Sequence, residues 1–213
     1  MTLKQSTVNS EQSFCIRLGK RRLIFGYAMC VISLFFARQE LFLPGIGLAV
    51  IGIALRVWSA GYIHKNEQVT TGGPYALTRN PLYLGSFLFG LGGMLAIRVW
   101  WLLAVYVVGF FTFYYPTMRS EEAYLQGKFG DQFDAYRKRV PFFLPWRKPS
   151  GGGSTPSRTN TPVREGVEPP PERIGEFSFA SVMRNKEHRY ALGSVTFLLI
   201  LEGVVRLRAF LGR

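Results

Sequence analysis

The stretch "LFLPGIGLAVIGIALRVWSAGY", residues 41–62, is continuously apolar except for one arginine. A helix needs about twenty apolar residues to cross the hydrocarbon core of a bilayer, so this stretch predicts a membrane span. Its glycines are small residues that let a neighbouring helix approach closely. Arg56 is the arginine, and two roles stay open for it: a functional role inside the span, or extension toward the lipid headgroups.

Three further apolar stretches predict spans at residues 23–37, 82–97 and 99–116. The turns at 38–40 and at Arg98 are very short, so the four spans form two hairpins. Both long polar connectors then lie on the side of the basic residues 20–22. Because basic loops stay in the cytoplasm, we expect this side to be cytoplasmic. We expect an all-α fold, a polytopic transmembrane bundle of four to five spans with a cofactor pocket on its cytosolic face.

The C-terminal part of the chain is expected to form two further units. We predict a membrane-embedded core over residues 1–146, a Gly/Pro/Ser-rich linker over 147–176 and a C-terminal helical segment over 177–213. Residues 190–205 are apolar but short, and arginines follow them. A fifth crossing would put those arginines on the side that basic residues avoid, and a surface or re-entrant helix is the alternative. We favour the fifth span.

Composition argues against several classes of function. The net charge of +13 suggests nucleic acid as a partner. However, the basic residues bracket apolar spans and do not alternate with aromatic residues, so we expect no nucleic-acid binding. The two cysteines and two histidines have no metal-site spacing, and we expect no metal. The first apolar stretch has no cleavage site of small residues, so we interpret it as the first span.

The stretch "GGPYALTRNPLYLG", residues 72–85, is a stiff loop before the third span. Gly72 and Gly73 permit positive φ angles and close approach of a ligand to the backbone. Prolines restrict the loop, and Arg79 offers a planar set of donors for a carboxylate or phosphate. By itself the loop fits two interpretations: a ligand site, or a rigid turn whose arginine pairs with lipid phosphate.

Two adjacent carboxylates, Glu121 and Glu122, follow the fourth span in a chain with few acidic residues. Acidic residues contribute little to membrane topology, so insertion alone does not explain them. Glu122 shares a helical stripe with Met118 and Leu125, and we expect it to point inward. Neighbouring residues on a helix diverge by about 100 degrees. Glu121 therefore either caps the helix, pairs with Arg119 or meets solvent.

These motifs, followed by "EEAYLQGKFGDQFDAYRKRVPFFLP" from residue 121, resemble the isoprenylcysteine carboxyl methyltransferase and phospholipid methyltransferase superfamily over roughly residues 50–145. Its members bind S-adenosylmethionine on the cytosolic side and methylate a lipid-linked acceptor. The resemblance implies catalytic roles for Arg79, Tyr83 and Glu122. Many relatives have histidine where this chain has Asn80. The cofactor-binding residues expected from the loop and the resemblance together are Gly72, Gly73, Pro74, Tyr75, Asn80, Pro81, Tyr83, Gly85, Glu121 and Glu122.

The acceptor stays open between two chemistries. An isoprenylcysteine-type carboxylate is favoured, and a phospholipid amine is the alternative. An amine must lose a proton, and His64 is the nearest candidate in sequence to carry it. Outside methyl transfer, an NADPH-dependent membrane reductase of related helical fold and a non-enzymatic membrane scaffold are the competing hypotheses. Expected partners are membrane lipid and a lipophilic or lipid-linked acceptor.

Overall fold

The computed structural model describes residues 21–37, 41–63, 69–145 and 177–212. This part of the chain is helical and contains no strand, which confirms the predicted all-α class. The predicted linker, residues 147–176, and His64 lie outside the described residues. The elements are a helix over residues 21–36, α2 (Leu43–Tyr62), the 3₁₀ turn η1 (Gly73–Ala76), α3 (Pro81–Ala96), α4 (Trp100–Phe129), α5 (Asp131–Arg139), α6 (Phe179–Arg184) and α7 (Glu187–Phe210).

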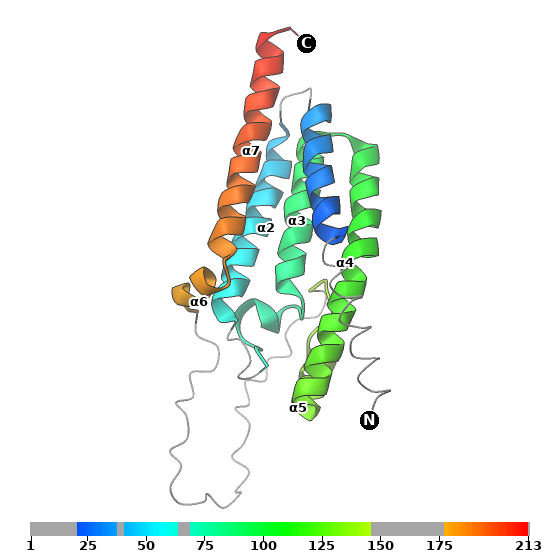
Figure 1. The fold of residues 1–213 in the computed structure, drawn as a ribbon, viewed down its shortest axis with the longest axis vertical. Helices are drawn as coiled ribbons and strands as arrows, with labels where there is room; N and C mark the ends of the chain where they lie inside the picture. Colours follow the sequence, from blue (N-terminus) through cyan, green and yellow to red (C-terminus); the bar gives the residue numbers. More distant parts are fainter. Residues whose placement is uncertain (1–20, 38–40, 64–68, 146–176, 213) are drawn as a thin grey trace, which may run out of the picture.

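The long helices run alongside one another and alternate in direction (Figure 1). The end of α2, the beginning of α3, η1, α5 and α6 gather at one end of the bundle, which we call the η1 end. The turn between α3 and α4 lies at the opposite end, as does the C-terminus of α7. The helices therefore follow the predicted order of spans, and the long connectors share one end.

Three helices of the described part, α2, α4 and α7, are long and apolar enough to cross a membrane. The helix α3 is apolar but shorter. Large apolar side chains stand exposed on the outside of the bundle, where lipid tails would cover them. Examples from four helices are Tyr27, Leu43, Val108, Leu192 and Leu199. The chain is thus a helical membrane bundle.

The close contact between α2 and α3 depends on glycine. A Cβ added at Gly52 would collide with the backbone nitrogen of Phe89 and lie 2.6 Å from the Gly85 carbonyl oxygen. A Cβ at Gly45 would lie 2.5 Å from the backbone nitrogen of Ala96. The two backbones touch because side chains are missing there, which is how small residues bring membrane helices together. Gly47, in contrast, faces open space.

The helix α4 is longer than we predicted. We expected the fourth span to end at about residue 116 and an amphipathic segment to follow, but one helix continues through Pro116 to Phe129. A proline removes one helical hydrogen bond, yet it does not end a helix whose next turn is held by packing. Here Met118 and Glu122 on the following turns are buried. The continuous helix carries the acidic pair from the bundle to the η1 end.

Arg56 forms an interhelical ion pair, which neither of its two predicted roles described. Its Nη2 lies 2.7 Å from Oε1 of Glu187, at the beginning of α7. Its Nη1 donates to the Ser86 hydroxyl, and its guanidinium carbon lies 3.8 Å from the centre of the Tyr190 ring. Both partners of the ion pair are largely buried, so Arg56 joins α2 to α3 and α7 inside the bundle.

The arginines after the last apolar stretch also have local partners. Arg208 donates from Nη1 to the carbonyl oxygens of Phe35 and Ala37, at 3.0 and 2.6 Å. These carbonyls end the helix over residues 21–36, where the last turn lacks intrahelical donors. Arg206 pairs with Glu202 at 2.7 Å. The basic charge that argued against a fifth span is therefore partly engaged within the bundle.

Candidate functional site

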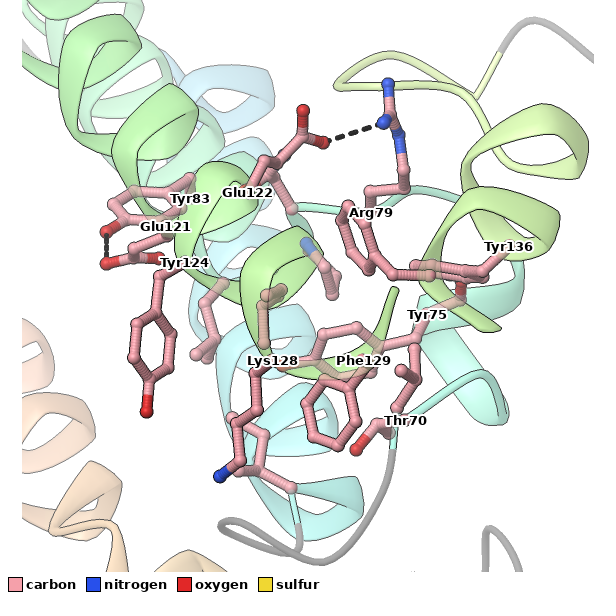
Figure 2. A pocket seen from close by; sticks show the side chains of 17 residues that line it. Thr70, Tyr75, Arg79, Tyr83, Glu121, Glu122, Tyr124, Lys128, Phe129 and Tyr136 are labelled. Carbon is pink, nitrogen blue, oxygen red and sulfur yellow. Dashed lines mark hydrogen bonds and ion pairs between the residues drawn. The ribbon is translucent and has the colours of Figure 1, made fainter. Parts of the chain in front are cut away.

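A pocket of about 280 Å³ lies at the η1 end of the bundle, among η1, the start of α3, the last turns of α4 and α5 (Figure 2). Small-molecule sites are concave and mostly apolar with a few polar groups, and this pocket has that character at the small end of the usual size range. Its lining residues are Ile63, Val69, Thr70, Tyr75, Arg79, Asn80, Pro81, Leu82, Tyr83, Glu121, Glu122, Tyr124, Leu125, Lys128, Phe129, Phe133 and Tyr136.

The loop before α3 is held in place by α5 and by the aromatic segment after it, residues 140–145. The backbone N–H of Arg79 donates to the Pro141 carbonyl at 3.0 Å. The side-chain amide of Asn80 donates to the Phe142 carbonyl at 2.9 Å, and Tyr136 Oη donates to the Tyr75 carbonyl at 2.8 Å. The stiff loop and the aromatic segment after α5 thus form one wall, although they are far apart in the chain.

Arg79 and Glu122 meet inside this wall. Nη1 of Arg79 lies 2.9 Å from Oε1 of Glu122, and their side chains are only 10% and 8% exposed. On the other oxygen of Glu122, Nη1 of Arg119 lies at 3.4 Å. Burial lowers the pKa of Arg79, and the neighbouring carboxylate of Glu122 opposes that shift. Burial also raises the pKa of Glu122, and the charges of Arg79 and Arg119 oppose that shift. An arginine keeps its charge in proteins, so Glu122 lies beside a permanent positive charge.

The Arg79–Glu122 contact leaves hydrogen-bonding capacity unused. Nε and Nη1 of Arg79 and Oε1 of Glu122 are buried, and none has a hydrogen-bond partner within the described part of the chain. The short distance from Nη1 to Oε1 is therefore an ion-pair contact without the alignment of a hydrogen bond. Buried polar groups are nearly always satisfied, so these three atoms are candidates for binding a ligand.

Glu121 has a different partner from Glu122. Tyr83 donates its hydroxyl proton to Oε1 of Glu121 at 2.5 Å and accepts a hydrogen bond from Nη1 of Arg22 at 2.9 Å. Figure 2 shows the Tyr83–Glu121 pair and the Arg79–Glu122 pair on different sides of the lining side chains. The two adjacent glutamates thus diverge, as expected for neighbours on a helix. Of the three possibilities left open for Glu121, none named Tyr83 as the partner.

The aromatic part of the wall stays uncharged. Burial raises the pKa of the Tyr75 and Tyr136 phenols well above the ordinary value, and neighbouring Tyr136 raises that of Tyr75 further. Phe129 and Phe133 line the same pocket. Neutral aromatic faces beside a buried carboxylate form a site suited to a cationic ligand.

The structure brings most of the predicted residues to this pocket. Seven line it: Tyr75, Arg79, Asn80, Pro81, Tyr83, Glu121 and Glu122. Four do not line it: Gly72, Gly73, Pro74 and Gly85. Gly73 has φ of 55° and lies against the Tyr62 ring, where a Cβ would come within 2.6 Å of Cζ. At Gly85 a Cβ would lie 2.6 Å from Cγ of Arg56. Gly73 therefore shapes the turn beside the pocket, and Gly85 allows α2 and α3 to approach closely.

Sequence reasoning did not assign several lining residues to the site. Tyr124 and Lys128 follow Glu121 at helical spacing, so they extend its face of α4. Phe133 and Tyr136 are spaced likewise on α5. That spacing was a usable signal. Val69 and Thr70 carried none, because their position depends on the path of the connector. In the described residues, no group of three or more His, Cys, Asp or Glu side chains could hold a metal ion.

Comparison with known proteins points to one family. The family profile described as "Phospholipid methyltransferase" matches residues 21–132. The chain is 38% identical over 108 residues to the cobalt-zinc-cadmium resistance protein CzcN of Cupriavidus metallidurans, covering 47% of this chain and 46% of the relative. It is 33% identical over 82 residues to the protein-S-isoprenylcysteine O-methyltransferase of Schizosaccharomyces pombe, covering 38% of this chain and 35% of the relative.

A second relative named for metal resistance matches the chain over a similar length. The nickel-cobalt-cadmium resistance protein NccN of Alcaligenes xylosoxydans xylosoxydans is 36% identical over 105 residues, covering 47% of this chain and 46% of the relative. The matched part of the chain thus spans less than half the length of these curated relatives. No solved structure matches the chain.

Proposed function

Because the chain belongs to the phospholipid methyltransferase family, within a superfamily that includes isoprenylcysteine methyltransferases, we propose that it is a membrane enzyme transferring a methyl group from S-adenosylmethionine to a lipophilic acceptor. The single observation that carries this proposal is the buried Arg79–Glu122 pair with unused hydrogen-bonding atoms. It lies in the pocket that also contains Tyr75, Tyr83 and Glu121.

The donor set of the pocket fits the amino-acid end of this cofactor. That end carries a carboxylate and an ammonium on one carbon. Nε and Nη1 of Arg79 are donors without acceptors among the described residues, and a guanidinium suits a carboxylate. Oε1 of Glu122 is an acceptor without a donor, and it suits the ammonium. A zwitterion would therefore satisfy both partners of a buried ion pair together.

Other side chains of the pocket suit the rest of the molecule. When bound, S-adenosylmethionine supplies a methyl group on a sulfonium cation, already activated for transfer. The faces of Tyr75 and Tyr136 are neutral and suit that cation. Glu121, fixed by Tyr83, is an acceptor for ribose hydroxyls. The apolar side chain of Leu82 lines the pocket and helps to exclude water from it. The role of this chain is then to position the methyl donor and the acceptor in a water-poor pocket.

We favour an isoprenylcysteine-type carboxylate as the acceptor. A carboxylate carries its own nucleophilic oxygen and needs no general base, whereas an ammonium acceptor must first lose a proton. Among the described residues that line the pocket, there is no histidine to take that proton. The name of the Schizosaccharomyces pombe relative supports the same choice. A phospholipid amine stays the alternative.

The distribution of charge supports a cytoplasmic position for the pocket. Arg22 is in contact with Tyr83 beside the pocket, and basic residues also end α5 at the η1 end. Basic residues at one end of a membrane bundle favour retention of that end in the cytoplasm. We propose that residues 1–146 form the enzyme core that opens there, and that residues 147–176 link it to the C-terminal segment over 177–213.

Two measurements on purified, detergent-solubilised protein test the proposal. Isothermal titration with S-adenosylmethionine, S-adenosylhomocysteine and NADPH should give binding for the first two and none for NADPH. Binding of NADPH instead would favour the reductase, and binding of none would favour the scaffold. Incubation with tritiated methyl donor and either a farnesylated cysteine derivative or phosphatidylethanolamine identifies the acceptor. A methyl ester releases its label in mild base, and an N-methyl group does not.

A further inference from the structure

The C-terminal segment, which we define as residues 177–212 with α6 and α7, lies outside the family match at 21–132 and is packed on α2. Ile63, the residue that follows α2, lines the pocket. Figure 1 shows α6 beside the lower end of α2 and α7 running along it. The inference below rests on the proposed function, because it assigns this segment a role in cofactor binding.

The first link is at the C-terminal end of α2. The backbone N–H of Ser178 donates to the Gly61 carbonyl at 3.0 Å, and Nδ2 of Asn185 donates to the Ala60 carbonyl at 3.1 Å. The last turn of a helix has carbonyls without intrahelical donors. The C-terminal segment donates to two of the last carbonyls of α2, and that of Ala60 also accepts from the Ile63 N–H at 3.4 Å.

The second link is aromatic. The Phe177 ring lies directly on Gly61, where an added Cβ would collide with it. The same ring stands 6.1 Å from the Tyr62 ring, centre to centre, in an edge-on arrangement. Phe177 remains 45% exposed with these contacts, and nearby Phe179 is 68% exposed. Phe177 therefore buttresses the last residue of α2.

The third link reaches the pocket. The Tyr62 ring lies against Gly73, and a Cβ added to Gly73 would lie 2.6 Å from Cζ of Tyr62. Gly73 also has a positive φ of 55°. Gly73 begins η1, and Tyr75 in that turn lines the pocket. Thr70, which also lines the pocket, donates its hydroxyl to the Tyr62 carbonyl at 3.5 Å. Tyr62 thus touches the wall of the pocket on one side and Phe177 on the other.

The fourth link prevents the segment from shifting along α2. Nη2 of Arg56 lies within 2.7 and 3.0 Å of the two carboxylate oxygens of Glu187, and Nε donates at 3.1 Å. Such a two-pronged contact fixes distance and direction together. The ion pair is largely buried, so breaking it would leave a charge without a partner. The start of α7 therefore has one position relative to α2.

We propose that the C-terminal segment completes the cofactor site, with Phe177 and Tyr62 as positioning residues that hold Tyr75 and the η1 turn in the binding geometry. Neither side chain lines the pocket itself, and both act on it only through the contacts described above. Without support from Tyr62 and Phe177, the η1 turn would be held only by its own loop, and Tyr75 could shift with it. A misplaced binding group makes a weaker interaction with its ligand.

The test measures S-adenosylmethionine binding by isothermal titration, with a thermal melt of each purified full-length variant. Phe177→Ala should raise the Kd about fivefold, in the range of couplings carried through packed side chains. Phe177→Tyr keeps the ring and should restore the wild-type Kd. Phe179→Ala, the same change at an exposed site of the same segment, should leave the Kd unchanged. Asn185→Ala removes the donor to Ala60 and should raise the Kd in the same direction.

Each outcome decides between the two proposals. A wild-type protein that does not bind S-adenosylmethionine overturns the proposed function. Wild-type binding together with an unchanged Kd in Phe177→Ala and Asn185→Ala overturns only this inference. Equal losses in Phe177→Ala and Phe179→Ala, or no rescue by Phe177→Tyr, also overturn it. If Phe177→Ala cannot be purified in folded form, Asn185→Ala decides the question by itself.

Discussion

Arg79 and Glu122 stand 2.9 Å apart with their side chains about nine-tenths buried, one in the loop before α3 and the other on α4. Burying an ion pair removes both charges from water, and the attraction often does no more than offset that cost. Fold stability alone is therefore a poor reason for this pair. Nε, Nη1 and Oε1 have no hydrogen-bond partner in the described part of the chain, and the cofactor that we propose would use them.

Replacing the planar donor group at position 79 should weaken cofactor binding. Arg79→Lys keeps the positive charge beside Glu122 but removes the fork of donors that suits a carboxylate. We expect the Kd for S-adenosylmethionine to rise about tenfold, which corresponds to about 1.4 kcal/mol. Isothermal titration measures it. Arg139→Lys on the exposed end of α5 is the matched control and should bind normally. An unaltered Kd in Arg79→Lys would exclude this residue from the site.

The hydroxyl of Tyr83 should matter more than its ring. Tyr83→Phe removes the donor to Glu121 and the acceptor for Arg22 while leaving the aromatic packing in place. A hydrogen bond to a charged group contributes on the order of 1.5–3 kcal/mol, so we expect cofactor binding to fall about tenfold or more. Tyr115→Phe, an exposed position on α4, is the control. If both variants bind S-adenosylmethionine with the same Kd, the hydrogen bond from Tyr83 to Glu121 does not contribute to cofactor binding.

The amide of Asn80 should be required as a donor. Asn80→Asp is nearly isosteric, but it places a carboxylate against the Phe142 carbonyl that the amide now donates to. The carbonyl would keep only the longer bond from the Thr78 hydroxyl, at 3.4 Å, and would face a carboxylate. This change costs about 1–3 kcal/mol, so the melting temperature should fall. Gln132→Glu makes the same chemical change at an exposed site of α5 and should melt like the wild type. Equal melting of the two variants would show that the loop is held by other contacts.

Two glycines of α2 should differ sharply in their tolerance of alanine. At Gly52 a methyl group would collide with the backbone of α3, whereas at Gly47 it would meet nothing within 4 Å. Overpacking of this kind costs about 1–3 kcal/mol. We therefore expect Gly52→Ala to unfold at a lower concentration of sodium dodecyl sulfate in mixed micelles, and Gly47→Ala to match the wild type or exceed it slightly. The reverse order would mean that α2 and α3 do not pack as described.

Local patterns in the sequence were sufficient for much of the fold. The apolar stretches gave the order and approximate bounds of the helices at 21–36, α2 and α3, because span length follows from bilayer thickness. The inward direction of Glu122 followed from its helical stripe, and it is 7% exposed. The continuity of α4 through Pro116 was not predicted, because the proline is a local signal and the packing of the next turns outweighs it.

The site was predictable only in part. Arg79, Glu121 and Glu122 were recognisable because unusual charged residues beside membrane spans require a reason. Gly85 was expected in the pocket, but it lies between α2 and α3, and no local property distinguishes a glycine that approaches a ligand from one that approaches a helix. The partners of Arg56 were likewise not predictable, because Glu187 is on a C-terminal helix whose position in the bundle the sequence left open.

By itself, the sequence determined which segments form the apolar helices of the bundle and which polar residues stand at their ends, because hydropathy and charge are properties of each segment. The tertiary structure decided which of those polar residues meet. It paired Arg79 with Glu122 and Arg56 with Glu187, since the short range of ion pairs and hydrogen bonds makes them depend on how distant helices pack.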